Sequence, residues 1–153
     1  MSLEGKKAPE FSLPGSDGRV HSLKLYKGKT VVLYFYPKDD TPGCTKEACG
    51  FRDNFSAVSK LAVVLGVSKD SVATHGEFIA KYGLPFVLLA DEDAKVMEAF
   101  GAWGEKMMYG KTVVGVIRST VVIGPDGTVL KHWKRVPEAA THPDAVLAFL
   151  QTI

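Results

Sequence analysis

The run Thr30–Tyr36 is the feature that most constrains what this chain can fold into. Its residues are nearly all apolar, β-branched or aromatic, and none of them carries a charge. A strand of this composition, without alternation of apolar and polar side chains, is typical of the centre of a sheet that is covered on both faces. The chain therefore requires a sheet with packing elements on either side, which predicts an α/β architecture.

Strand and helix patterns alternate along the rest of the chain. Apolar runs predict further strands, and apolar side chains spaced by three and four residues predict helices. Turn residues at Pro14–Gly18 and Gly124–Gly127 lie between extended runs and predict hairpins. We expect strands at Ala8–Leu13, Arg19–Leu23, Ala62–Val67, Phe86–Ala90, Gly115–Ile123 and Thr128–Val136, and helices at Cys44–Leu61, Ser71–Tyr82, Ala94–Phe100 and Thr141–Gln151.

This order of elements predicts a mixed central sheet flanked by helices, as in a thioredoxin-like fold, with an added N-terminal β-hairpin. The 153 residues are expected to form one domain over 1–153. A net charge of +2 and scattered Lys and Arg residues argue against a nucleic-acid partner. Because the N-terminus lacks an apolar signal core and every apolar run is too short to span a bilayer, we expect a cytoplasmic protein with no membrane partner.

The only two cysteines, Cys44 and Cys49, lie where the apolar run is followed by the first predicted helix. In a reducing cytosol such cysteines are more often catalytic, redox-sensing or metal-binding than a structural crosslink. Thr41 is a good N-cap and Pro42 fits the first helical position, which places Cys44 in the first turn. Unpaired N–H groups and the helix dipole favour an ionised sulfur there, so we predict that Cys44 is substantially thiolate at neutral pH.

A disulfide between the two cysteines is incompatible with an intact helix. About 7.5 Å of rise and about 140° of rotation separate Cys44 from Cys49, whereas a disulfide requires Cα atoms within about 7 Å. If the bond forms, part of Cys44–Gly50 has to unwind, and Gly50 makes unwinding easier because it weakens a helix by about 1 kcal/mol relative to Ala.

Other interpretations of the cysteines remain open from the residues alone. Cys49 could be a core residue on the inner face of the helix, and Cys44 a small buried apolar side chain. A metal site is disfavoured, because zinc takes four ligands and the chain offers two cysteines at poor helical spacing. Its four histidines are scattered singly along the sequence, and we expect each to be structural or solvent-facing.

The cysteine segment resembles a known family. Pro37, Thr41 and Cys44, in the pattern Pro-x-x-x-Thr-x-x-Cys, resemble the active-site signature of peroxiredoxins. The longer run Tyr34–Cys49 is similar to the Q-type branch, also called bacterioferritin comigratory protein. The resemblance covers essentially the whole chain and extends to Gly66–Ser71, Trp103–Lys106, Tyr109–Lys111 and Arg118–Thr120.

The resemblance implies a thiol-dependent peroxidase that reduces hydrogen peroxide and organic hydroperoxides. It also implies that Cys44 is the peroxidatic cysteine, that Cys49 resolves it through an intramolecular Cys44–Cys49 disulfide, and that thioredoxin or a similar protein is the reductant. Arg118 would be the active-site arginine, which keeps the sulfur ionised and stabilises charge on the departing oxygen. No metal, haem or flavin is expected, and members of this branch are often monomers.

Supporting roles follow for the residues around the cysteine. Thr41 is expected to orient the peroxide, because a hydroxyl both donates and accepts. The backbone N–H of Gly43 is a further donor, and its missing side chain is expected to let substrate approach. Pro37 and Pro42 are expected to border the substrate and shield the oxidised sulfur, and Glu47 to tether the arginine or the loop.

Two other functions are compatible with a thioredoxin-like fold. A thiol–disulfide oxidoreductase would act on protein disulfides, but that chemistry typically uses Cys-x-x-Cys at the helix start. A non-enzymatic redox sensor would use the Cys44–Cys49 pair to alter a surface that binds a partner. The longer spacing of the two cysteines favours the peroxidase over the oxidoreductase.

Overall fold

A five-stranded sheet with the strand order β5–β4–β3–β8–β9 organises the chain. The structure is a computed structural model and describes residues 2–153. Strand β3 (Val31–Phe35) occupies the centre of the sheet, and each of its residues is buried. The apolar run Thr30–Tyr36 therefore predicted the central strand correctly.

The sheet is mixed, as predicted. Strand β3 runs parallel to β4, and β4 runs parallel to β5. On the other side, β8 is antiparallel to both β3 and β9. The four neighbouring strands are β4 (Val63–Ser68), β5 (Val87–Ala90), β8 (Ser119–Ile123) and β9 (Val129–Trp133).

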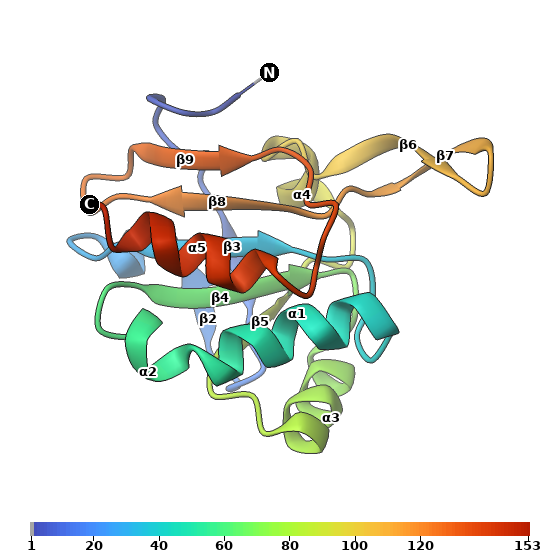
Figure 1. Ribbon diagram of the computed structural model, residues 1–153, viewed down its shortest axis with the longest axis horizontal. Coiled ribbons are helices and arrows are strands. Elements are labelled where there is room, and N and C mark those ends of the chain that lie inside the picture. Colours follow the sequence, from blue (N-terminus) through green and yellow to red (C-terminus); the bar gives the residue numbers. More distant parts are fainter. Residues whose placement is uncertain (1) are drawn as a thin grey trace.

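Helices cover both faces of the sheet (Figure 1). Val32 and Tyr34 of β3 join a core with α1, α2, α3 and α5, whereas Leu33 and Phe35 join the opposite core with α4. None of these helices in residues 2–153 is long and apolar enough to cross a bilayer. Their bounds are α1 (Pro42–Asp53), α2 (Phe55–Val58), α3 (Val72–Tyr82), α4 (Lys95–Ala99) and α5 (His142–Leu150).

The predicted N-terminal hairpin is present and is shorter than expected. Strand β1 (Ser12–Pro14) pairs antiparallel with β2 (Val20–Ser22), and the 3₁₀ helix η1 (Lys24–Tyr26) follows. The hairpin turn covers the edge of the sheet at β5, where the Ser16 N–H donates to the Leu88 carbonyl. A covered edge cannot pair with a strand of another molecule.

The sequence predicted one continuous helix over Cys44–Leu61, and this prediction is wrong because the helix is interrupted. Helix α1 ends at Asp53, and α2 begins only after Asn54, whose ψ of 5° departs from helical geometry. The Asn54 amide donates to the Asp144 carboxylate of α5 at 2.8 Å. An asparagine side chain that bonds outside its own helix favours a break at that residue.

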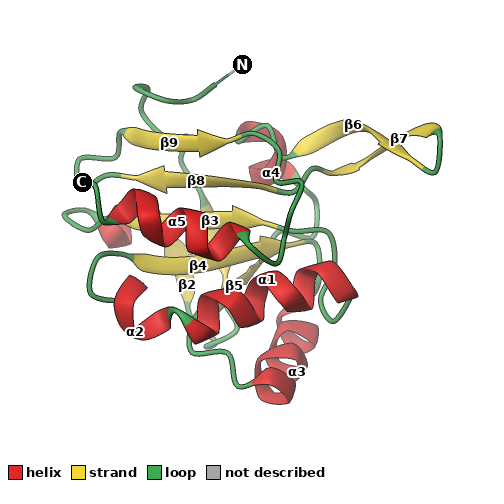
Figure 2. Ribbon diagram, in the orientation of Figure 1, coloured by secondary structure: helices red, strands yellow, loops and turns green. Residues whose placement is uncertain are grey.

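The predicted strand Gly115–Ile123 is also wrong, because it joins parts of two different sheets. Strand β7 (Lys111–Val116) pairs with β6 (Trp103–Met108) in a hairpin that projects from the body of the protein, whereas β8 belongs to the central sheet (Figure 2). Tyr109 and Gly110 form the turn with φ values of 53° and 78°, as a two-residue hairpin turn requires. Tyr109 is 96% exposed at the tip of this hairpin.

Candidate active site

Cys44 lies at the start of α1, where the sequence placed it. Pro42 is the first helical residue and Thr41 is the N-cap, with extended backbone angles, so Cys44 is the third residue of the helix. The Thr45 N–H donates to the Thr41 carbonyl at 2.8 Å and closes the first turn. Only 2% of Cys44 is exposed, which removes most water from its sulfur.

Thr41 occupies the N-cap position, but its side chain does not cap the helix. Its hydroxyl donates instead to the carbonyl of Lys38 at 2.7 Å, within the loop that precedes α1. The hydroxyl hydrogen is therefore engaged in the loop, and the oxygen retains lone pairs that can accept a hydrogen bond.

Arg118 lies between β7 and β8, where the chain returns from the hairpin to the central sheet. Its guanidinium Nη2 donates to the Cys44 sulfur at 3.3 Å, and its Nη1 donates to Oε1 of Glu47 at 2.6 Å. The planar guanidinium presents both donors in a fixed geometry. A permanent positive charge therefore lies within hydrogen-bond distance of the sulfur.

Glu47 lies one helical turn after Cys44 and is completely buried. Residues three apart in a helix share a face, so one arginine can reach both side chains. Burial raises the pKa of Glu47 to about 7, and the nearby charge of Arg118 opposes this shift without cancelling it. The second carboxyl oxygen, Oε2, has no hydrogen-bond partner among the described residues. The Glu47 carboxyl therefore changes between its protonated and ionised forms near neutral pH.

Gly43 gives Arg118 room to reach the sulfur. A Cβ atom built on Gly43 would lie 3.2 Å from Nη2 of Arg118, tighter than an ordinary van der Waals contact. The sequence had assigned the small size of this residue to the approach of substrate. In the structure, the missing side chain of Gly43 instead leaves room for the guanidinium of Arg118.

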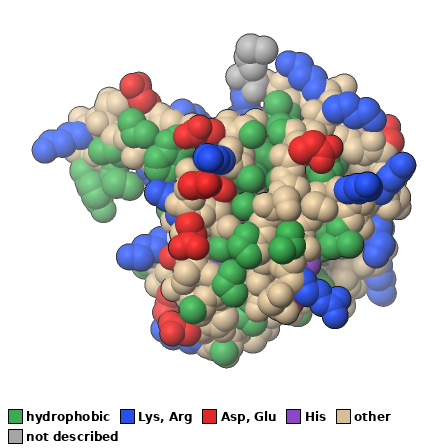
Figure 3. All heavy atoms as spheres, turned by 180° about the vertical axis from the view of Figure 1, so that it is seen from behind, with side chains coloured by type: hydrophobic (Ala, Val, Ile, Leu, Met, Phe, Trp, Pro, Cys, Tyr) green, Lys and Arg blue, Asp and Glu red, His purple; other side chains and the backbone are tan. Residues whose placement is uncertain are grey.

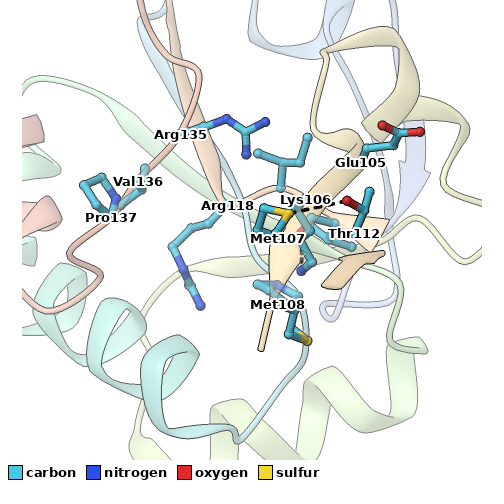
Figure 4. A pocket seen from close by; sticks show the side chains of 12 residues that line it. Glu105, Lys106, Met107, Met108, Thr112, Arg118, Arg135, Val136 and Pro137 are labelled. Carbon is cyan, nitrogen blue, oxygen red and sulfur yellow. Dashed lines mark hydrogen bonds between the residues drawn. The ribbon is translucent and has the colours of Figure 1, made fainter. Parts of the chain in front are cut away.

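An open groove of about 1100 Å³ lies beside the arginine, and Arg118, Pro37 and Lys106 are among its lining residues (Figure 4). Pro37 is half-buried here, whereas Pro42 is exposed on the first turn of α1. Apolar side chains of the projecting hairpin extend this surface, and hydrophobic atoms gather on the hairpin in the rear view (Figure 3). The groove is thus bordered by cations and by apolar side chains.

Sequence reasoning gave no individual role to Lys106 of β6. Its ammonium donates to the Val116 carbonyl at 2.7 Å, and its side chain lies across Gly115, whose Cβ would be 3.5 Å from Cε. Burial and the charge of Arg118 lower the pKa of Lys106. The one signal in the sequence was Gly115, which lies diagonally across the hairpin from Lys106; a glycine in a strand indicates a close approach but not which residue makes it.

Cys49 lies further along α1, half-buried, and neither cysteine is in a disulfide. The helix is continuous between the two cysteines, as expected for the reduced state. Gly50 has a packing role: a Cβ there would lie 2.7 Å from Cγ of Pro143 in α5. Because α1 approaches α5 this closely at Gly50, a larger residue at this position would disturb the helix pair. The fold and this site define a thioredoxin-like protein that reacts through a thiol.

Comparison with known proteins identifies the family. The AhpC/TSA family profile matches residues 4–132. Peroxiredoxin Bcp of Bacillus subtilis is 47% identical over 155 aligned positions, which cover 100% of this chain and 96% of that protein. Peroxiredoxin Bcp of Escherichia coli is 45% identical over 148 residues, covering 96% and 94%. The chain belongs to the AhpC/TSA family, and within it to the Bcp or Q-type peroxiredoxins.

Solved structures agree with this assignment. Peroxiredoxin Q of Xanthomonas campestris superposes with a TM-score of 0.86 at 44% identity, covering 93% of this chain and 90% of that one. A cysteine-to-serine mutant of Xylella fastidiosa PrxQ gives 0.90 at 36% identity, covering 97% and 95%. The thioredoxin-like fold and the family resemblance predicted from the sequence are confirmed, and the protein is an enzyme of the peroxidase class.

The contact between Gly43 and Arg118 predicts opposite effects of a methyl group on stability and on reactivity. Gly43→Ala should leave the free energy of unfolding unchanged or raise it by up to about 1 kcal/mol, because Ala favours a helix. Displacing Nη2 should slow oxidation of Cys44 by peroxide about tenfold, the loss expected for one hydrogen bond to a charged group. Gly76→Ala in α3 is the matched control, since its Cβ meets nothing within 4 Å. Equal rates for Gly43→Ala and wild type would contradict this account.

The raised pKa of Glu47 predicts a stability change with pH. In the native state this carboxyl holds its proton up to about pH 7, whereas its ordinary pKa is 4.5, so the native state binds more protons in between. Stability therefore falls as pH rises through this window. Unfolding by denaturant, measured from about pH 5 to about pH 8, should show wild type losing up to about 3 kcal/mol relative to Glu47→Gln. If the free energy of unfolding changes with pH in the same way for both proteins, Glu47 is already ionised at the lower pH.

Proposed function

We propose that this protein reduces hydrogen peroxide and organic hydroperoxides through the Cys44 thiolate. The observation that carries the proposal is the 3.3 Å contact between Nη2 of Arg118 and the Cys44 sulfur at a helix start. The thiolate attacks the terminal oxygen of the peroxide, and the O–O bond breaks. The products are a sulfenic acid on Cys44 and a molecule of water or alcohol.

Fixed donors lower the barrier to this step. Negative charge moves onto the departing oxygen as the O–O bond breaks, and groups already aimed at it need no reorganisation. Arg118 supplies a permanent charge, and the N–H groups of Gly43 and Cys44 lack helical partners in the first turn. Thr41, whose hydrogen is engaged with Lys38, accepts from the O–H of the peroxide.

The groove beside Arg118 supports organic hydroperoxides as substrates alongside hydrogen peroxide. Its lining includes apolar side chains such as Met107, Met108 and Val116 close to Pro37. Apolar side chains of this kind bind the hydrocarbon part of an alkyl hydroperoxide and leave the O–O group at the arginine. A relative from Xanthomonas campestris, 43% identical, is described by its alkyl peroxide reduction activity.

Resolution is assigned to Cys49. Its thiolate attacks the sulfenic sulfur of Cys44, a disulfide forms and water leaves. Because both cysteines lie in the continuous helix α1, the first turns of α1 have to unwind for the sulfurs to meet. Thioredoxin or a similar protein then reduces the disulfide and returns the helix to its folded state.

All of the proposed site residues come from one chain, so a monomer is sufficient for the reaction. We propose that residues 1–153 act as one domain, of which residue 1 lies outside the described part. A reducing compartment such as the cytoplasm suits an enzyme whose two cysteines must return to the thiol form.

Peroxide consumption with thioredoxin, thioredoxin reductase and NADPH tests the proposal. Cys44→Ser should abolish turnover, because it removes the attacking sulfur, and Cys49→Ser should reduce it sharply while Cys44 still reacts once. If wild-type Cys44 is oxidised once per molecule but no turnover follows, thioredoxin is not the reductant and another protein has this role. A Cys44 that does not react with peroxide would overturn the proposal.

A further inference from the structure

The loop between β3 and α1 contains a carboxylate that is buried although it lies only five residues before Cys44. The Asp39 side chain is 1% exposed, and its partner His75 in α3 is completely buried. One oxygen of Asp39 accepts from the Tyr36 hydroxyl at 2.6 Å, and the other lies 2.6 Å from Nδ1 of His75. Both carboxylate oxygens are therefore held by groups outside α1.

The hydrogen bonds of His75 fix the number of protons in this pair. Nε2 lies 2.9 Å from the carbonyl of Leu89, which can only accept, so Nε2 carries a hydrogen. The bond between Nδ1 and Asp39 then needs one further proton, either on the ring or on the carboxyl. In both cases the pair has no net charge, which makes its complete burial tolerable.

The backbone of the same loop is tied to the turn that follows β4. The Asp39 N–H donates to the Asp70 carboxylate at 2.8 Å, and the Ser68 hydroxyl donates to the same oxygen at 2.6 Å. Side chain and backbone of Asp39 are thus anchored in two different directions. An anchor of this kind fixes the position of the loop as well as its distance from α3.

The next residue, Asp40, is anchored as well. Its carboxylate accepts from Nζ of Lys81 at 2.7 Å and from the Tyr82 hydroxyl at 2.6 Å, both on α3. Its φ of 57° lies in the left-handed region, which is strained for a residue with a side chain. The surrounding contacts hold this conformation, which turns the chain into Thr41 and the start of α1.

The cluster is not suited to a metal ion. Potential ligand atoms of Asp39, Asp70 and His75 lie within 4.8 Å of one another. Both ring nitrogens of His75 and both oxygens of Asp39 are already engaged in protein hydrogen bonds. A cation would have to displace these bonds inside a buried site, so the cluster serves the structure of the loop.

We propose that Asp39 and His75 are positioning residues that hold the Thr41–Cys44 turn in register with Arg118, and that they fix the upstream end of the segment that unwinds. Arg118 and Cys44 come from separate elements, so the distance from sulfur to guanidinium depends on where the loop is held. The anchors lie on α3, β4 and β5, and they persist when the first turns of α1 are lost. This inference rests on the role proposed for Cys44.

Two substitutions of Asp39 distinguish the effect of its hydrogen bonds from the effect of its carboxylate charge. Asp39→Ala removes both bonds and should slow oxidation of Cys44 by hydrogen peroxide by about tenfold to a hundredfold, the scale of a misplaced reacting group. Asp39→Asn should stay within about threefold of wild type, because its amide donates to Nδ1 of neutral His75 and its oxygen accepts from Tyr36. Asp91→Asn is the matched control: Asp91 is equally buried but accepts from N–H groups of α4.

Hydrogen exchange of the wild-type protein tests the same inference without any substitution. In the disulfide form, the amides of 45–49 should lose protection, whereas the amide of Asp39, which donates to Asp70, should keep it. Loss of protection at the Asp39 amide would overturn the assigned boundary.

The rate measurements have their own contrary results. A folded Asp39→Ala protein that reacts at the wild-type rate, or an Asp91→Asn protein slowed as much as Asp39→Ala, would overturn the positioning role. A wild-type Cys44 that is inert to peroxide would instead refute the proposed function, and protection of the Asp39 amide in the reduced protein would still report on the anchor itself.

Discussion

One guanidinium joins the parts of this site, because Arg118 bonds both the Cys44 sulfur and the Glu47 carboxyl. Glu47 is completely buried, and a buried charge that loses its partner costs roughly 3–5 kcal/mol. Cys44 bonds the same guanidinium through its sulfur and is only 2% exposed, so the charge of Arg118 acts on it with little screening by water.

The arginine is shared between two acids, and this sharing links reactivity to pH. While Glu47 is protonated, below about pH 7, no ionised carboxylate offsets the charge of the guanidinium at the sulfur. When Glu47 ionises, its carboxylate offsets part of this charge, but the ion pair fixes the orientation of the guanidinium more firmly. Ionisation of Glu47 therefore weakens the electric field of Arg118 at the sulfur, and at the same time it fixes the direction in which the guanidinium points.

The sequence predicted the elements whose signals are local. The apolar run of β3, the helix start at Thr41–Pro42 and the position of Cys44 all follow from composition, capping and dipole. The hairpin β6–β7 was missed because its strands are largely exposed and lack the alternation that marks a half-buried strand. For the same reason Gly115–Ile123 was taken for one strand, although the chain passes between two sheets at Arg118.

Contacts between distant residues could not be predicted without the fold. The family resemblance named Arg118 and Glu47, but the steric role of Gly43 and the anchors of Asp39 depend on side chains that lie 31 to 75 positions away. Lys106 was missed for this reason too. Local patterns indicate where a helix or strand begins, whereas the partners of a buried polar group are set by the packing of the whole chain.

The most direct test of the account is the rate constant for oxidation of Cys44 by hydrogen peroxide in Arg118→Ala, measured in a Glu47→Gln background. The second substitution prevents an unpaired buried carboxylate from unfolding the protein, and Glu47→Gln alone serves as the reference. The account predicts a loss of about a hundredfold or more, the scale for removing one donor to a developing negative charge. A rate close to that of the reference would remove Arg118 from the chemistry and contradict the account.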